Sequence, residues 1–384
     1  YSKTPMKKCK PLIRSLLRMG AYQILFMDVR DAAACSEAVS LAKKRGFGRL
    51  SGFANGVLRT LVREKENLPV PDKKDDVKYV SITYSVPEWL SKLIIEQYGK
   101  ESAEKIFASF LEARPLTIRT NLSKTTPEEL EKELEEAGVK VEKGNYLPYA
   151  FTISNLNYLG KIAAFRQGKF AVQDESSQLA VAIADINEGD FVLDVCAAPG
   201  GKTFHAADRL KGAGKVLSRD LTEYKTELIE ENKDRMHYEN VEVQQWDALE
   251  EDESLLESVD VLLADLPCSG LGIMGRKNDI KYQMTEEQLG ELAALQRQIL
   301  SVVWKYVKPG GQMIFSTCTL NKGENAENIK WIEKNTPLHL VSIEEYLPQN
   351  LKNRTGSQGY LQLIPGEDTC DGFFISKFKR PEAK

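Results

Sequence analysis

Residues 191–203, FVLDVCAAPGGKT, decide the fold of this chain. The first half is a nearly continuous apolar run of strand length, typical of a central parallel strand covered on both faces. Pro199 ends the strand, and Gly200 and Gly201 let the backbone turn tightly and approach a ligand closely. A helix from Thr203 would direct unpaired N–H groups at that ligand. The stretch predicts a buried strand, a ligand-binding turn and a helix.

The turn suits a nucleotide-like ligand but matches neither common phosphate-binding motif. It lacks the G-x-G-x-x-G of dinucleotide folds. Gly201-Lys202-Thr203 looks like the end of a P-loop, yet no glycine stands five residues before Gly201. A plain tight turn in an α/β sheet stays open as the alternative.

Strands and helices alternate from residue 168 to the C-terminus, which predicts a doubly wound α/β sheet over residues 168–384. The expected strands are 191–197, 215–221, 241–247, 260–266 and 311–317. The expected helices are 176–186, 203–211, 223–236, 285–307 and 324–335, followed by a hairpin over 359–378.

Two smaller domains are expected before this sheet. Residues 1–72 predict a helical unit, with apolar residues at helical spacing over 11–26, 35–44 and 50–62. Residues 68–76, LPVPDKKDD, indicate a linker. Residues 73–167 predict a small α+β domain, with helices over 87–98, 102–113 and 127–137 and strands over 116–121, 139–142 and 150–154.

The front of the chain is basic although the whole chain carries a net charge of −4. Residues 1–70 contain fourteen Lys and Arg against five Asp and Glu, about +9, which leaves about −13 for the remainder. A basic unit of this kind is an electrostatic footprint for nucleic acid. A solvated basic helix face is the equally open alternative.

Composition excludes several classes of protein. The 384 residues suit two or three domains, and no apolar run approaches the roughly 20 residues of a membrane span. We expect no signal peptide within these residues. Six cysteines without a C-x-x-C pair, beside three histidines, argue against a metal site and fit a reducing cytosol. We expect a cytoplasmic monomer, because no strongly apolar surface stretch is evident.

Acidic residues recur where the expected strands end, at Asp220, Asp247 and Asp265. The carboxyl ends of parallel strands share one edge, so the three carboxylates should meet the ligand of the glycine turn. Asp220 is spaced to accept hydrogen bonds from ribose hydroxyls. Each aspartate alone could instead cap a helix.

Cys268 and Cys318 also follow expected strands at this edge. A lone cysteine is usually a small buried hydrophobe, which is the interpretation for the other four. Two cysteines at strand ends beside aspartates are candidates for a nucleophile and its acid/base partner.

Three segments resemble the RNA cytosine-5 methyltransferases of the NOL1/NOP2/Sun family: DVCAAPGGKT at 194–203, DLPCSG at 265–270 and STCT at 316–319. FAVQDESSQ at 170–178 and DGFF at 371–374 look like its flanking motifs. The segments 17–23 and 52–59 are similar to the NusB-like domain that bacterial members of the family carry.

The resemblance implies a class I, Rossmann-like methyltransferase domain with S-adenosylmethionine as cofactor. The small α+β domain precedes it, and an RNA-binding NusB-like domain that is N-terminally incomplete stands at the front. The implied substrate is a cytosine of 16S, small-subunit ribosomal RNA. The residues implied to hold the cofactor are Cys196, Ala197, Ala198, Pro199, Gly200, Gly201, Lys202, Asp220, Asp247 and Asp265.

The resemblance also implies the catalytic roles. Cys318 would add to carbon 6 of cytosine, because carbon 5 alone is too poor a nucleophile to take a methyl group. Asp265 would hydrogen-bond ring nitrogen 3, and Cys268 would assist release of the product. Arg276, Lys277 and Lys281 could hold the backbone of an unpaired RNA loop, although an Arg-Arg-His-Pro-like run is expected where this chain has Arg276-Lys277-Asn278.

Three other functions stay open. The same chemistry on transfer RNA is the near alternative. An amino methyltransferase would carry a similar acid-x-Pro motif but would need no thiol. A non-catalytic RNA-binding or antitermination module would use only the basic front, and the two cysteine motifs count against it.

Overall fold

The computed structural model describes residues 1–69 and 71–383. Val70, inside the predicted linker, and Lys384 lie outside the described residues. The chain separates into two compact units, Tyr1–Asp72 and Lys73–Lys384.

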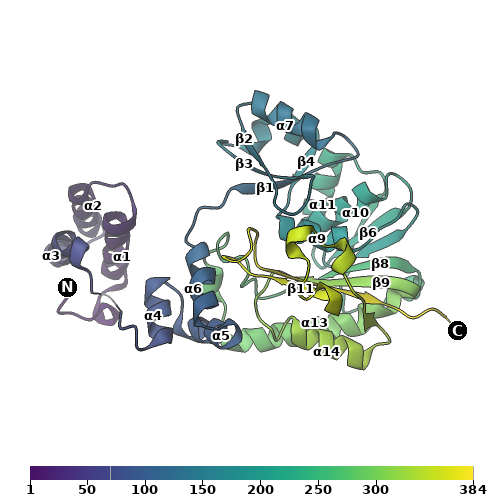
Figure 1. The fold of residues 1–384 in the computed structure, drawn as a ribbon. Coiled ribbons are helices and arrows are strands. Elements are labelled where there is room, and N and C mark those ends of the chain that lie inside the picture. The colour runs from purple at the N-terminus through teal and green to yellow at the C-terminus, as the bar shows by residue number, and fades with distance from the viewer. Residues whose placement is uncertain (70, 384) are drawn as a thin grey trace. The chain divides into compact units, whose positions relative to one another are not determined.

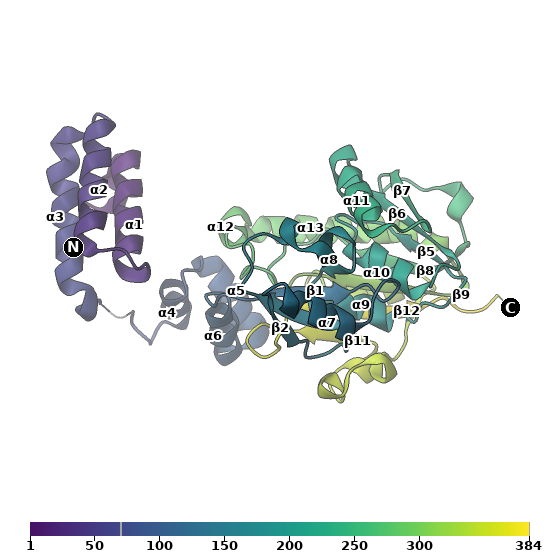
Figure 2. The ribbon, with the colours of Figure 1, turned by 90° about the horizontal axis from the view of Figure 1, so that it is seen from above.

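The first unit consists of three helices that lie side by side (Figure 2). They are α1 (Pro11–Phe26), α2 (Asp31–Lys44) and α3 (Gly48–Glu64). Ile13, Leu17, Ala38 and Leu58 are buried between them, as the apolar spacing predicts. Close packing explains Gly20, since a Cβ there would lie 2.8 Å from the Leu58 side chain. The predicted helices are confirmed, with α2 and α3 beginning earlier than expected.

The second unit begins with three short helices, α4 (Asp76–Thr83), α5 (Glu88–Tyr98) and α6 (Lys100–Ser109). The last two were predicted, but α4, which begins where the predicted linker of residues 68–76 ends, was not. Asp75 caps α4 by accepting a hydrogen bond from Lys78 N at 3.0 Å. Val80 is the buried residue of α4, so the helix carries little apolar periodicity.

A four-stranded antiparallel sheet follows, in the order β2-β3-β1-β4 (Figure 1). Its strands are β1 (Leu116–Thr120), β2 (Lys140–Lys143), β3 (Ala150–Ser154) and β4 (Phe170–Val172). The helices α7 (Pro127–Glu136) and α8 (Ala163–Arg166) bury Leu130, Leu134 and Ala164 with this sheet. The short strand β4 was not predicted, since three residues are too few to show a period.

The large sheet has the order β10-β12-β9-β8-β5-β6-β7, with β11 beside β12. Its parallel strands are β5 (Phe191–Asp194), β6 (Lys215–Asp220), β7 (Val241–Gln245), β8 (Val259–Asp265) and β9 (Val307–Thr317). The strands β10 (His339–Leu340), β11 (Tyr360–Leu363) and β12 (Phe373–Lys379) run antiparallel to their partners. The predicted α/β sheet and its closing hairpin are confirmed.

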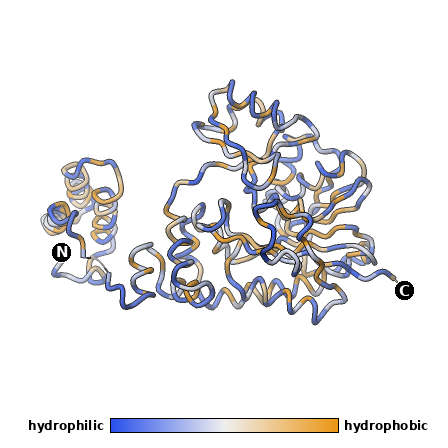
Figure 3. The backbone as a smooth tube through the Cα atoms, viewed as in Figure 1, coloured by the Kyte–Doolittle hydropathy of each residue, from blue (hydrophilic) through white to orange (hydrophobic). Residues whose placement is uncertain are grey.

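Helices cover both faces of the large sheet (Figure 1). On one face α9 (Glu175–Ile183), α10 (Gly201–Arg209) and α11 (Glu223–Met236) pack against alternate strand residues such as Val192 and Val216. On the other face α13 (Glu286–Val303) and α14 (Ala326–Asn335) pack against the intervening residues, such as Leu193 and Leu217. The short helix α12 (Ile280–Gln283) precedes α13. Figure 3 shows apolar colouring along the covered strands and hydrophilic stretches on outer helices such as α7.

Strand order reverses between β5 and β8, because the chain passes from β5 through β6 to β7 and then returns to the other side of β5. In such sheets ligands bind outside the carboxyl ends of the strands at the reversal point. The loops that follow β5 and β8 therefore border the expected binding crevice.

Candidate active site

The glycine turn follows β5 directly. The strand ends at Asp194, three residues earlier than predicted, and Gly200 N donates to the Ala197 carbonyl at 2.7 Å to close the turn. Gly200 has a φ of +101° and stands at the N-cap of α10. A Cβ at this position would lie 2.3 Å from the Phe204 ring, so only glycine fits.

A cavity of about 170 Å³ lies beside this turn. Its walls come from the turn, from the end of β8 and from the segment that joins β4 to α9. The lining residues are Val172, Gln173, Asp174, Ser177, Asp194, Cys196, Ala197, Ala198, Pro199, Gly201, Lys202 and Asp265. Seven of the ten residues predicted to hold a cofactor therefore share one cavity.

Asp194 is an acidic group of this cavity that sequence reasoning did not select. One carboxylate oxygen accepts a hydrogen bond from Thr203 Oγ1 at 2.8 Å, and Oδ1 is buried without a partner. Burial raises the pKa of Asp194 to about 7. A buried carboxyl with an unmet oxygen is suited to a cationic ligand group.

Asp220 and Asp247 lie outside the lining of the cavity. Asp220 is 3% exposed and supports the turn from behind, since its Oδ2 accepts from Ala198 N at 2.9 Å. Its Oδ1 accepts from Lys225 Nζ at 2.9 Å. Asp247 accepts a local hydrogen bond from Leu249 N at 2.9 Å. The ribose and adenine contacts of these two residues stay predictions.

Asp265 ends β8 and forms an ion pair with Lys202 of α10, with 2.6 Å between Oδ2 and Nζ. Its Oδ1 accepts from Ser316 Oγ at 2.7 Å. The parallel register of β8 and β9 sets Asp265 opposite Ser316 and so fixes this carboxylate. The Lys202 ammonium also lies 5.0 Å from the centre of the Phe373 ring. The Asp265 side chain remains 29% exposed, which leaves it accessible to a substrate.

The two predicted thiols are in contact, with 3.2 Å between the sulfur atoms of Cys268 and Cys318. The hydrogen bond to Cys318, together with burial, raises the pKa of Cys268 well above its ordinary value. Cys268 therefore retains its proton and can donate it toward the Cys318 sulfur. Burial also raises the pKa of Cys196 and Cys370. Cys370 is buried, as the interpretation as a small hydrophobe predicts, whereas Cys196 is only partly buried and lines the cavity beside the glycine turn.

Glu324 connects the two cysteine loops, and sequence reasoning missed it. Its fully buried carboxylate accepts hydrogen bonds from Ser269 N at 2.9 Å and from Ser269 Oγ at 2.6 Å. Ser269 Oγ lies 2.6 Å from Thr319 Oγ1, so a hydrogen bond joins the residue after Cys268 to the residue after Cys318. A glutamate just before a helix resembles an ordinary first-turn residue, and no local signal distinguishes it.

Helix α5 binds the same loops from outside. Tyr98 donates its hydroxyl to the Leu320 carbonyl at 2.6 Å, and burial raises the pKa of Tyr98. Leu271, Met274 and Leu320 pack in the core that α4, α5 and α6 form. The helices before the small sheet thus restrain both loops that carry the thiols.

Arg276, an expected RNA contact, forms ion pairs within the protein. Its guanidinium pairs with Asp371 at 2.6 Å and with Asp174 at 3.0 Å. These pairs join the Cys268 loop to the DGFF segment and to the cap of α9, so Arg276 has a structural role. Lys277 has no ion pair among the described residues, and partial burial lowers the pKa of Lys281.

Comparison with known proteins identifies the family. Residues 181–379 match the family described as 16S rRNA methyltransferase RsmB/F. The probable ribosomal RNA small subunit methyltransferase B of Bacillus subtilis is 36% identical over 382 residues, which span 97% of this chain and 84% of that protein. The chain belongs to the RsmB/F family.

Two further family models match segments nearer the N-terminus of this RsmB/F member. Residues 1–63 match the NusB family, and residues 86–157 match the ferredoxin-like domain of RsmF/B-like methyltransferases. The ribosomal RNA small subunit methyltransferase B of Vibrio cholerae is 30% identical over 380 residues, 97% of this chain and 82% of that protein. The crystal structure of PH0851 aligns with a TM-score of 0.82 at 27% identity, covering 98% of this chain and 84% of that one.

These findings confirm the predicted fold class and enzyme class. The RsmB/F chain is a ribosomal RNA small subunit methyltransferase with a NusB-like helical front, a small α+β domain and a Rossmann-like sheet. Within residues 1–69 and 71–383, no helix combines the length and apolar character that a membrane crossing requires. In the same residues no three His, Cys, Asp or Glu side chains are grouped to hold a metal ion.

Proposed function

We propose that this RsmB/F member transfers a methyl group from S-adenosylmethionine to carbon 5 of a cytosine in 16S ribosomal RNA, through a covalent adduct of Cys318. The observation that carries the proposal is the contact of two thiols, 3.2 Å apart, at the sheet edge that also bears Asp265. An amino methyltransferase would need neither thiol. Ribosomal RNA follows from the family and from the names of the relatives.

The cavity beside the glycine turn fits the methionyl end of the cofactor. The walls formed by Ala197 and Ala198 are small, and Gly200 and Gly201 leave the backbone accessible. The unpartnered Asp194 oxygen would pair with the cationic amino group, while Asp220 would hold the ribose and Asp247 the adenine. When bound, the cofactor supplies an electrophilic methyl group on a sulfonium sulfur.

Cys318 would perform the covalent addition, and the Asp265–Lys202 pair would stabilise the charge that develops on the ring. The thiolate of Cys318 adds to carbon 6, which forms a sulfur–carbon bond and moves an electron pair into the ring. The Lys202 ammonium, 2.6 Å from Asp265, can pass its proton to that carboxylate, and the protonated Asp265 then donates a hydrogen bond to nitrogen 3, which offsets the charge on the ring. Carbon 5 then takes the methyl group. Loss of the carbon 5 proton and elimination of Cys318 restore both the ring and the thiolate.

The roles of the two thiols follow from their environment. A free thiol with a pKa of about 8.5 is only a few per cent ionised at neutral pH, so a nucleophilic cysteine needs assistance. The proton that Cys268 retains can be donated to the Cys318 sulfur and stabilise its thiolate. Cys268 is then the acid/base partner that assists product release.

The test uses S-adenosylmethionine labelled on its methyl group with unmethylated 16S ribosomal RNA and, separately, transfer RNA. We expect label at carbon 5 of one 16S cytosine. Label confined to transfer RNA would favour the alternative substrate. Label on an exocyclic amine would overturn the proposed reaction, and binding of RNA without any transfer would favour a non-catalytic module.

Cofactor affinity should decrease below pH 7. Asp194 has a pKa of about 7 because it is buried, so a proton must leave it before a cationic group can pair with it. We expect the Kd for S-adenosylmethionine to rise about tenfold for each pH unit below 7 and to stay level above pH 7.5. Calorimetric titration between pH 5.5 and 8.5 measures this dependence.

Two variants complete that test. Asp194→Asn should weaken binding at pH 8 and remove the pH dependence. Glu327→Gln, at an exposed carboxylate on α14, should bind like the unmodified enzyme at every pH. A Kd that does not change with pH in the unmodified enzyme would contradict the role of Asp194.

A further inference from the structure

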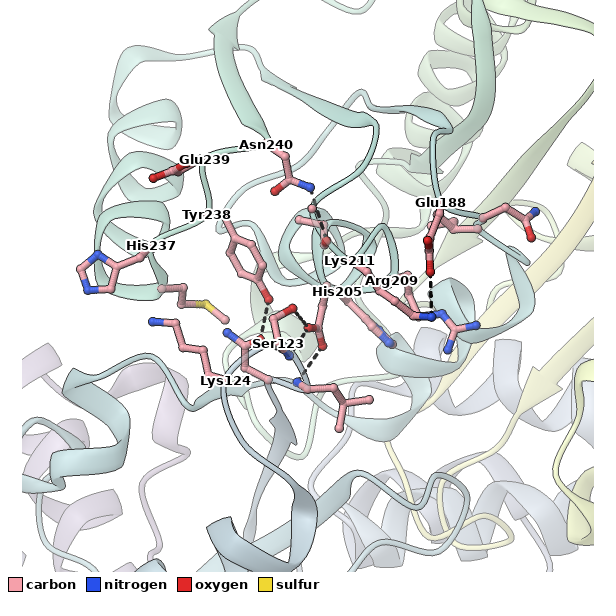
Figure 4. Close-up of a pocket in the computed structure, with 18 residues that line it drawn as sticks. Ser123, Lys124, Glu188, His205, Arg209, Lys211, His237, Tyr238, Glu239 and Asn240 are labelled. Carbon is pink, nitrogen blue, oxygen red and sulfur yellow. Dashed lines mark hydrogen bonds and ion pairs between the residues drawn. The ribbon is translucent and has the colours of Figure 1, made fainter.

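A cavity of about 790 Å³ shares no lining residue with the cavity beside the glycine turn, and Figure 4 shows the residues that line it. Its walls are residues 186–188, 209–212 and 236–240, which precede β5, β6 and β7, together with residues 121–124 of the small domain. These strands are parallel, so the cavity lies at their amino ends. The cysteines and Asp265 lie at the opposite, carboxyl edge, and methyl transfer makes no use of this cavity.

Two cations on the rim lack a carboxylate partner among the residues that the structure describes. Lys211 pairs with Glu188 at 2.8 Å, and the buried Asp208 pairs with Arg119 at 3.0 Å. Within the described part of the chain the Lys124 ammonium donates only to the Gln167 carbonyl, at 2.8 Å, and the Arg209 side chain has no hydrogen bond or ion pair.

The positions of these cations suit an extended anionic ligand. Figure 4 shows Lys124 and His237 on one side, Arg209 and Lys211 on the other, and Tyr238 between them. Glu239, at the side of His237, is the carboxylate of the rim without a cation partner. Lys124 and Arg209 thus leave an excess of positive charge on the rim.

The floor of the cavity has unmet hydrogen-bonding capacity. His205 is 2% exposed, its ring lies 5.5 Å from that of Tyr149, and its Nδ1 has no partner. Burial lowers the pKa of His205 well below its ordinary value, so the imidazole is neutral and can both donate and accept. Buried polar atoms are nearly always paired in native proteins, so an unpaired one beside a cavity indicates a polar ligand.

Amide groups complete the polar wall. The side chains of Asn187 and Asn240 donate to the Asp185 and Ala207 carbonyls, at 2.9 Å and 3.4 Å, which leaves their own carbonyl oxygens as acceptors. Donors and acceptors of this kind read the edges of unpaired bases. Apolar surface from Ile186 and Met236 lies between them.

We propose that this cavity is a second RNA site, which binds one or two unpaired nucleotides of the substrate with their phosphates on Arg209 and Lys124. The inference rests on the proposed function only in taking RNA as the substrate. The shared chemistry is that of a nucleoside phosphate, and a free nucleotide is the other source of it. A large folded RNA reaches both edges of the sheet at once, so this contact would position the RNA without touching the reacting base.

The test compares RNA binding by the whole protein with two double variants. Lys124→Ala with Arg209→Ala removes both rim cations. Lys132→Ala with Lys330→Ala is the matched control, because it removes the same charge from side chains that are 79% and 71% exposed on α7 and α14. The Kd of unmethylated 16S ribosomal RNA is measured by filter binding from 50 to 300 mM KCl.

The cavity variant should bind about tenfold more weakly at 100 mM KCl, and its slope of log affinity against log salt should decrease by about 1.4, or about 0.7 for each lost phosphate contact. Its kcat at saturating RNA should be unchanged. The conservative pair Lys124→Arg with Arg209→Lys should restore binding, which excludes misfolding as the cause.

Equal Kd and equal salt slope in the cavity and control variants would overturn the proposal. Binding of adenosine monophosphate that is lost in the cavity variant, with RNA binding unchanged, would also overturn it in favour of a free nucleotide. The measurement does not depend on methyl transfer. A failure of 16S methylation would therefore refute the proposed function and leave this result standing.

Discussion

Replacing Cys318 by alanine is expected to lower methyl transfer by at least about 10³-fold, while Cys268→Ala should trap a covalent enzyme–RNA adduct. Without Cys318 no thiolate can add to carbon 6, so carbon 5 stays unreactive. Without Cys268 the addition still occurs, but the partner that assists release is missing. The 3.2 Å contact between the sulfur atoms and the raised pKa of Cys268 assign the roles in this order.

Denaturing gels with labelled 16S ribosomal RNA and S-adenosylmethionine measure the adduct, and single-turnover assays measure transfer. Cys9→Ala, in the separate N-terminal unit, serves as the control and should match the unmodified enzyme. If Cys318→Ala accumulates the adduct and Cys268→Ala forms none, the two roles are reversed. Full activity in Cys318→Ala would overturn the covalent mechanism.

The second large effect is expected at Asp265. The change Asp265→Asn keeps the size of the side chain and an oxygen that can accept from Ser316, but it removes the charge that pairs with Lys202 and the acid at nitrogen 3. General acid and electrostatic assistance together account for about 10²–10³ in rate. We therefore expect kcat to decrease by about that factor, with the KM for RNA changed less than about fivefold.

Ser316→Ala tests the same carboxylate indirectly, since it removes only the 2.7 Å hydrogen bond to Oδ1. It should lower kcat about tenfold, because Asp265 keeps its charge and its ion pair with Lys202. Steady-state kinetics on 16S ribosomal RNA measure both variants, with Glu327→Gln as the control. An Asp265→Asn enzyme within threefold of the normal kcat would exclude this residue from catalysis.

Most helices and strands of the fold could be predicted from local sequence. Residues 191–203 predicted β5, the turn and α10, because an apolar run, a proline and two glycines each restrict the backbone locally. The predicted strands around it were confirmed for the same reason, with boundaries differing by a few residues. The α-helices and strands that were not predicted, α4, α8, α12, β4 and β10, are all short, so they show little or no period.

The candidate site was only half determined in this way. That Asp265, Cys268 and Cys318 follow strands at one edge of the sheet was predicted from the alternation of strands and helices. That the two thiols touch, and that Asp265 is held by Lys202 and Ser316, depends on the register between β8 and β9. Packing across the whole sheet sets this register, so a short stretch of sequence does not show how the two strands align.

The difference between local sequence signals and contacts between distant segments also explains why the roles of Glu324, Arg276 and Asp247 were not predicted. The sequence by itself predicted that thiols and carboxylates gather at one edge of the sheet, because residues that follow parallel strands share that edge. Only the tertiary structure decided that Glu324 joins the two cysteine loops, that Arg276 serves internal ion pairs, and that Asp247 lies apart from the cavity. Those outcomes depend on which side chains meet after distant segments pack, and contact between distant segments has no signature in local spacing.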